Sequence, residues 1–153
     1  MKHIVIQGCR RLEGTLAVQG AKNSVLPVLA ATILHPGVTV LRGCPRLSDV
    51  EASIRILRHL GCQADWQGEE LVVDTSSMCR GDIPDHLMRE MRSSVIFLGA
   101  ILARLGRAEM SYPGGCELGP RPIDLHLSAL RKLGASVEEK GGHLCCEAGK
   151  MEG

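Results

Sequence analysis

Hydrophobic residues recur at helical spacing in four stretches of this chain, and shorter stretches between them alternate apolar with polar residues. The apolar run VLPVLAATIL predicts a buried helix over residues 22–34, with Pro27 in its first turn and His35-Pro36-Gly37 ending it. A strand is expected over residues 38–41. A second helix is expected over residues 47–61, where aliphatic side chains fall every three or four positions.

The start and end of this second helix also have sequence signals. Ser48 or Asp49 is expected to act as its N-cap, and Gly61 to end it. Two strands are expected next, over residues 63–66 and 70–73, joined by a turn at Gly68.

The second half of the chain repeats this order of elements. Ser24 and Ser94 stand 70 positions apart at the starts of two apolar helices, and Gly61 and Gly134 stand 73 apart after two amphipathic ones. The repeated elements are a helix over residues 95–105, a strand over 108–112, a helix over 123–133, and strands over 136–139 and 143–147. Such self-similarity predicts an α/β (α+β) unit of about seventy residues, present twice, over about residues 22–88 and 89–153.

The residues before the first helix predict two further strands, Lys2–Gln7 and Thr15–Gln19. In both segments every second residue is apolar, which is the pattern of a strand with one buried face.

Composition removes several classes of function. The 153 residues carry a net charge of +1 and three aromatic side chains, so neither a basic field nor a stacking surface for nucleic acid is expected. The longest apolar run, Val25 to Leu34, is too short to span a bilayer, so no membrane partner is expected. The seven cysteines include no CxxC pair and no zinc-like spacing with histidine. We therefore expect no metal and no cofactor, and a reduced, cytoplasmic setting.

Two cationic residues occupy matching positions in the repeat. Lys22 and Arg92 each stand just before an apolar helix. A helix start offers free N–H groups and a partial positive charge, so an added cation favours an anionic ligand. The alternative, that both are ordinary solvated surface cations, stays open at this point.

A glycine-rich loop, PGGCELGPRP, separates a strand from a helix in the second half of the chain. Its glycines permit unusual backbone angles and expose Cys116, whose thiolate form the nearby Arg121 would favour. Asp124 suits the first turn of the following helix, and could instead accept a hydrogen bond from a ligand. His126 is interpreted as a satisfied packing residue, and a lone loop cysteine can equally be incidental.

Three segments resemble the UDP-N-acetylglucosamine 1-carboxyvinyltransferases: GAKNSVLPVLAATIL, MRSSVIFLGAILARLG and PGGCELGPRPIDLHLSALRKLGA. The resemblance runs from the first predicted strand to the end of the chain, in order and with matching spacing. The sister 3-phosphoshikimate 1-carboxyvinyltransferases are similar in fold but lack the cysteine loop. The resemblance implies an EPSP-synthase-like inverse α/β prism, built of repeated βαβαββ-type units around buried helices, with about two units in this chain.

The resemblance also implies a reaction and its residues. The family transfers the enolpyruvyl group of phosphoenolpyruvate to the 3-hydroxyl of UDP-N-acetylglucosamine and releases phosphate, the first committed step of peptidoglycan synthesis. By this resemblance Lys22, which is also catalytic, and Asn23 contact phosphoenolpyruvate, and Arg92 sits at the phosphate and sugar side. Cys116 is implied as the general acid, as the residue forming a covalent adduct with phosphoenolpyruvate, and as the thiol alkylated by fosfomycin. The residues implied to hold the uridine diphosphate portion are Arg121, Pro122, Ile123, Asp124 and Leu125.

Family members are more than twice this length and fold as two similar domains. By resemblance, residues 1–21 belong to the far domain, and residues 22–153 form part of the first domain without its third unit. We expect the isolated chain to be inactive and to expose apolar helix surface that favours self-association. The alternative function is a non-catalytic UDP-sugar binding fragment. A thiol redox protein using Cys116 ranks last, because no resolving cysteine stands at a useful spacing.

Overall fold

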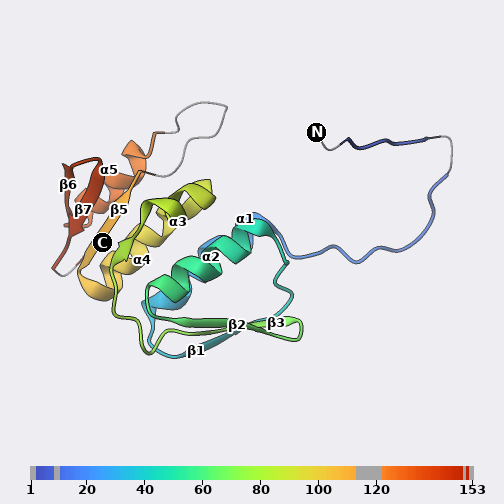
Figure 1. Ribbon diagram of the computed structural model, residues 1–153, viewed down its shortest axis with the longest axis horizontal. Helices are drawn as coiled ribbons and strands as arrows, with labels where there is room; N and C mark the ends of the chain where they lie inside the picture. The colour runs from blue at the N-terminus through green and yellow to red at the C-terminus, as the bar shows by residue number, and fades with distance from the viewer. Residues whose placement is uncertain (1–2, 9–10, 113–121, 150, 152–153) are drawn as a thin grey trace.

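Two sheets lie at two sides of a group of helices (Figure 1). The computed structural model describes residues 3–8, 11–112, 122–149 and 151. Mixed helices and strands confirm the predicted fold class.

The first unit is a three-stranded sheet with helices packed beside it. Its strands follow the order β1-β3-β2, and both neighbouring pairs are antiparallel. Its elements are α1 (Lys22–Ala31), the 3-10 helix η1 (Thr32–Leu34), β1 (Val38–Leu41), α2 (Ser48–His59), β2 (Gln63–Gln67) and β3 (Glu70–Asp74).

The second unit is a four-stranded sheet with the order β4-β5-β7-β6. Strands β5, β7 and β6 pair antiparallel, whereas β4 joins the edge of β5 in parallel. Its elements are β4 (Asp82–Ile83), α3 (Asp85–Glu90), the 3-10 helix η2 (Arg92–Val95), α4 (Ile96–Leu105), β5 (Arg107–Ser111), α5 (Asp124–Lys132), β6 (Ser136–Lys140) and β7 (His143–Glu147).

The repeated order of elements is confirmed, since β1-α2-β2-β3 and β5-α5-β6-β7 have the same connectivity and the same strand pairing. The prediction that glycines end two of the helices is confirmed at Gly61, which follows α2, and at Gly106, which ends α4. Gly61 and Gly106 have φ angles of 96° and 72°, which a side chain would strain. Sequence reasoning missed β4 and α3, because two and six residues are too short to show a period.

The prediction that Ser48 or Asp49 caps α2 is wrong. Leu47 occupies the N-cap position in an extended conformation, and neither Ser48 nor Asp49 bonds back to the helix start as a cap. Both residues instead lie within the first turn of the helix, where the carboxylate of Asp49 suits the helix dipole.

The prediction of two opening strands is also wrong. Residues 3–8 and 11–20 carry no strand and form an arm that extends away from the helices (Figure 1). The apolar side chains of Ile4, Ile6, Leu16 and Val18 are 87–94% exposed. A strand is stable only beside a neighbour that accepts and donates its hydrogen bonds, and the described part of the chain offers this arm none.

The core lies where the helices meet the inner faces of the two sheets. α1 packs against α2 and α4, and α2 packs against β2. Leu29, Ile33, Phe97 and Ile101 are fully buried there. The apolar α4 is therefore a central element of the core, as its run of aliphatic side chains predicts. Because α4 is packed in the core, the segment η2 that leads into it is also fixed in position.

Candidate active site

The starts of α1 and α2 lie side by side. Lys22 is the first residue of α1, and its Nζ lies 3.0 Å from Oδ2 of Asp49 in the first turn of α2. Ala21 and Leu47, the two N-cap residues, make no side-chain hydrogen bond to the helix that follows. The first backbone N–H groups of both helices are thus left to water or a ligand, beside a lysine.

Asn23 follows Lys22 in the first turn of α1 and is exposed. The backbone N–H groups of Ser24 and Val25 bond to the carbonyl of Ala21 at 3.1 Å. The N–H groups of Lys22 and Asn23 come earlier in the helix and cannot bond inside it. This helix start can accept an anion through backbone and side chain together.

The second cationic residue begins the corresponding helix of the second unit. Arg92 is half-buried and is the first residue of η2, which leads directly into α4. Ser94, fully buried two residues later, donates its hydroxyl to the carbonyl of Met88 at 3.1 Å. That bond ties the start of η2 to α3, so Arg92 stands on a well-packed segment.

The described part of the segment that is predicted to bind the nucleotide lies at the start of α5. Pro122 is exposed, Ile123 is a half-buried N-cap residue, and Asp124 is the exposed first residue of α5. Leu125, the next residue of the helix, is 82% exposed. Cys116 and Arg121 lie outside the described residues, so the roles predicted for them stay predictions.

Two buried polar groups flank residues 113–121 in the sequence. The hydroxyl of Ser111, at the end of β5, and Nε2 of His126, in α5, are buried and have no hydrogen-bond partner within the described structure. Burial lowers the pKa of His126, which favours the neutral ring. Among the described residues Nε2 of His126 has no hydrogen-bond partner, so the interpretation of His126 as a satisfied packing residue is not met there. No sequence signal pointed to Ser111.

Asp49 was predicted only as a helix cap, and the structure reveals it as the partner of Lys22. The two residues stand 27 positions apart, so no helical or strand spacing could have linked them. Their pairing depends on how α1 packs against α2, which a single sequence does not display.

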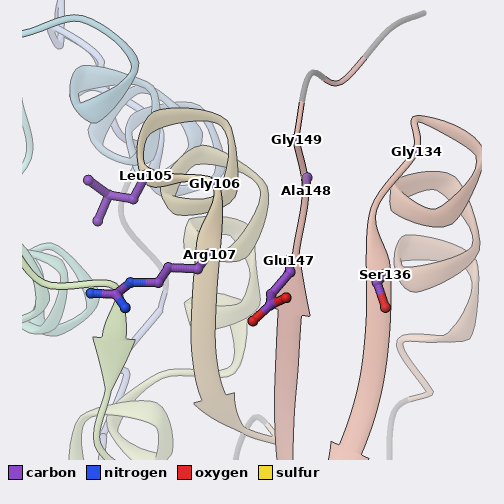
Figure 2. Close-up of a pocket in the computed structure, with 8 residues that line it drawn as sticks. All are labelled: Leu105, Gly106, Arg107, Gly134, Ser136, Glu147, Ala148 and Gly149. Atoms are coloured by element: carbon purple, nitrogen blue, oxygen red, sulfur yellow. The ribbon is translucent and has the colours of Figure 1, made fainter.

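An open pocket of about 600 Å³ lies at the opposite ends of α4 and α5 (Figure 2). Gly106 and Gly134 mark the ends of these helices there, and Arg107, Glu147 and Ser136 come from three neighbouring strands. Helix C-termini carry a partial negative charge, which disfavours anionic ligands. A smaller pocket of about 190 Å³ lies beside the start of α1, between that helix and residues 41–45.

Buried thiols stay protonated. Burial raises the pKa of Cys62 to about 11, and it also raises the pKa values of Cys44 and Cys146. In the part of the chain that the structure describes, no three histidine, cysteine or acidic side chains come together as metal ligands. The described helices are each too short or too polar to cross a membrane.

Comparison with known proteins identifies the family. The chain matches EPSP synthase (3-phosphoshikimate 1-carboxyvinyltransferase) over residues 6–150. It is 51% identical over 148 residues to UDP-N-acetylglucosamine 1-carboxyvinyltransferase 2 of Caldanaerobacter subterraneus subsp. tengcongensis, covering 97% of this chain and 36% of that protein. It is 44% identical to UDP-N-acetylglucosamine 1-carboxyvinyltransferase of Dichelobacter nodosus, covering all of this chain and 37% of that protein.

Solved structures agree on the fold. The enolpyruvyl transferase NikO from Streptomyces tendae superposes with a TM-score of 0.77 at 24% identity, covering 92% of this chain and 31% of that one. EPSP synthase from Acinetobacter baumannii superposes with a TM-score of 0.66 at 18% identity, covering 92% and 33%. This chain thus spans just over a third of the length of the relatives it matches. The resemblance found in its motifs is confirmed, and the chain belongs to the EPSP synthase family of carboxyvinyl (enolpyruvyl) transferases.

Proposed function

We propose that this chain carries the phosphoenolpyruvate and sugar-nucleotide side of a UDP-N-acetylglucosamine 1-carboxyvinyltransferase. In that reaction the sugar 3-hydroxyl oxygen bonds to the enolpyruvyl carbon, the methylene is transiently protonated, and elimination releases inorganic phosphate. The observation that carries the proposal is Lys22 beside the uncapped starts of α1 and α2, in a chain whose relatives bear this name. The reaction would be the first committed step of peptidoglycan synthesis, in the cytoplasm.

The cationic helix starts would bind the phosphate-bearing substrates. Lys22 and Asn23 would contact phosphoenolpyruvate through their side chains and the open N–H groups of α1. Arg92, at the start of η2, would lie at the phosphate and sugar side. A guanidinium group suits this role because it donates two parallel hydrogen bonds to phosphate oxygens.

The start of α5 would hold the uridine diphosphate. Asp124 is exposed there and can accept a hydrogen bond from a ring nitrogen or hydroxyl, while the exposed Leu125 offers an apolar contact to a base. Arg121, Pro122 and Ile123 would complete this segment. An exposed leucine beside an exposed carboxylate suits a ring with polar edges, because ligand sites combine apolar surface with a few polar groups.

Cys116 would be the reactive group. As a general acid it would protonate the methylene of phosphoenolpyruvate, and as a thiolate it would form the covalent adduct and be alkylated by fosfomycin. This role is carried by the resemblance of the glycine-rich loop alone. It therefore needs the most direct test.

The test is mass spectrometry of the purified chain after exposure to fosfomycin, with and without UDP-N-acetylglucosamine. We expect one adduct per chain, at Cys116, formed faster with the sugar nucleotide present. Cys116→Ser should abolish it, and Cys79→Ser, which removes a thiol that is exposed in the described structure, should not. Sugar-nucleotide binding without alkylation would favour the alternative, a non-catalytic UDP-sugar binding fragment. Labelling of several thiols alike would contradict both.

We further propose that the isolated chain does not turn over. Residues 1–21 would belong to the far domain and residues 22–153 to an incomplete first domain, with repeats at about 22–88 and 89–153. Exposed apolar side chains such as Val28 and Leu34, which are 46% and 54% exposed, would favour self-association. A phosphate-release assay on the purified chain checks this, and sustained release dependent on both substrates would contradict it.

A further inference from the structure

We infer that Asp49 is a positioning residue for Lys22, holding the lysine ammonium group at the adjoining starts of α1 and α2. The inference rests on the proposed function, because it concerns the lysine that would bind the phosphate-bearing substrate. It adds a residue that the sequence motifs did not single out for this role.

The ion pair between the two residues joins two separate helices. Nζ of Lys22 lies 3.0 Å from Oδ2 of Asp49, and the two side chains are 50% and 24% exposed. A lysine has four rotatable side-chain bonds and, when half-exposed, samples many rotamers. A partner at hydrogen-bond distance selects the rotamers that keep the ammonium group over the two helix starts.

Asp49 is itself firmly held. Its backbone carbonyl accepts the hydroxyl of Ser53 at 2.9 Å, and Ser53 is fully buried. Val50, the next residue, is also fully buried, so the first turn of α2 is anchored in the core. The carboxylate therefore stands on a rigid element, whereas the lysine would otherwise be free to move. This asymmetry identifies Asp49 as the positioning partner and Lys22 as the positioned one.

A helix-dipole role alone does not account for this arrangement. Glu51 lies in the same first turn of α2 and also suits the dipole, but it accepts the indole N–H of Trp66 at 2.9 Å. Two acids of one helix turn thus have different partners. Glu51 provides a matched control, since its removal takes the same charge from the same turn without touching Lys22.

The sign of the effect separates positioning from plain charge. A carboxylate close to an anion site repels the anion, so by charge alone its removal would tighten phosphate binding. By positioning, its removal releases the lysine and weakens binding by about threefold to tenfold, the usual loss for one mobile side chain.

The experiment is an NMR titration of the folded chain with inorganic phosphate and with phosphoenolpyruvate, comparing wild type, Asp49→Asn, Asp49→Glu and Glu51→Gln. The reporters are the backbone amides of Lys22 and Asn23 and the side-chain ammonium signal of Lys22. We expect Asp49→Asn to bind both anions more weakly and to shift the ammonium signal before ligand is added. Asp49→Glu should restore part of the affinity, and Glu51→Gln should match wild type.

Equal or tighter anion binding by a folded Asp49→Asn variant would overturn the inference. So would an ammonium signal of Lys22 that this substitution leaves unchanged, and that readout needs no ligand. If instead the ammonium signal moves as expected but neither anion perturbs the start of α1 in wild type, the ion pair stands. In that case the proposed binding role of Lys22 fails, and the positioning role fails with it.

Discussion

The two units share one connectivity but differ in what covers them. In the second unit β4 and α3 precede α4 and lie against β5, so that β5 has a neighbour on each side. In the first unit the segment before α1 is the extended arm, and β1 has one strand neighbour within the described structure. The aligned positions Val28 and Leu98 show the result, since the first is 46% exposed and the second is fully buried.

The outer faces of the two sheets differ as well. The outer face of the first sheet carries three valines. Val40 pairs directly with Val72, and Val38 lies two positions before Val40 on the same strand. The matching face of the second sheet carries Glu109 and Glu147 beside Arg107. A repeated sequence can therefore set the path of the chain twice while leaving each copy with its own surface, because the buried inner face and the turns fix the strand register.

The largest expected effect tests the difference between the two apolar helices. Leu98→Ala should lower the free energy of unfolding by about 2–5 kcal/mol, because it opens a cavity in a fully buried part of α4. Val28→Ala, at the aligned position of α1, should lower it by less than about 1 kcal/mol, since the side chain is half in water. Urea unfolding followed by circular dichroism measures both. Equal losses would show that the face of α1 carrying Val28 is covered in solution.

A second substitution pair tests glycines in the two units. Gly61 has a φ of 96°, and an added Cβ would lie 3.0 Å from the carbonyl oxygen of Ser77. Gly61→Ala should therefore destabilise the fold by about 2–3 kcal/mol, from strain and crowding together. Gly141 has a φ of 59° and open space around it, so Gly141→Ala should cost about 1 kcal/mol from backbone strain alone. Thermal and urea unfolding measure both losses. A larger loss of stability in Gly141→Ala than in Gly61→Ala would contradict this order.

A smaller effect concerns the link between the units. Asp82 of β4 accepts hydrogen bonds from Arg80 and lies 3.1 Å from Nε2 of His59 in α2. Its hydrogen bond with Arg80 is the main cause that lowers the pKa of Asp82 to about 2. Because the folded pKa lies below the unfolded value, the contribution to stability is complete above about pH 4 and is lost as the pH falls toward 2.

At pH 7 Asp82→Asn should lower the unfolding free energy by about 0.2–1 kcal/mol, the range for exposed ion pairs. The difference from wild type should shrink between pH 4 and pH 2. A difference that stays constant over that range would mean that the carboxylate charge plays no part.

The smallest effect concerns the reactivity of buried thiols, which both units contain, and not the stability of the fold. The buried thiols Cys62 in the first unit and Cys146 in the second should react slowly with iodoacetamide at pH 8, because burial keeps them protonated. The exposed Cys79 should be labelled before both of these buried thiols. Labelling of Cys62 should rise as the pH approaches 11, and peptide mass spectrometry would refute this if Cys62 matched Cys79 at pH 8.

Sequence patterns predicted the elements that are long enough to show a period. The paired helices and strands of both units follow from apolar spacing, and their ends follow from Gly61 and Gly106. The arm was mispredicted because alternation indicates only that a segment can form a strand, and not that a neighbour exists. β4 was missed for the converse reason, since its two residues become a strand only beside β5.

The candidate site was predictable only where residues are adjacent in sequence. Lys22, Asn23 and the start of α5 stood out because helix starts can be recognised locally. The pairing of Lys22 with Asp49 and the buried hydroxyl of Ser111 depend on packing between elements far apart in the chain. Such contacts carry no local signature.

The position of β4 has a consequence for how a repeated protein of this kind can be assembled. By sequence β4 trails the first repeat, yet its backbone pairs with the second sheet. The boundary between duplicated segments and the boundary between sheets are therefore out of step. The first copy, excised at its predicted sequence boundary, would carry away the edge strand of the second sheet. The two copies are therefore interlocked through β4 rather than separable.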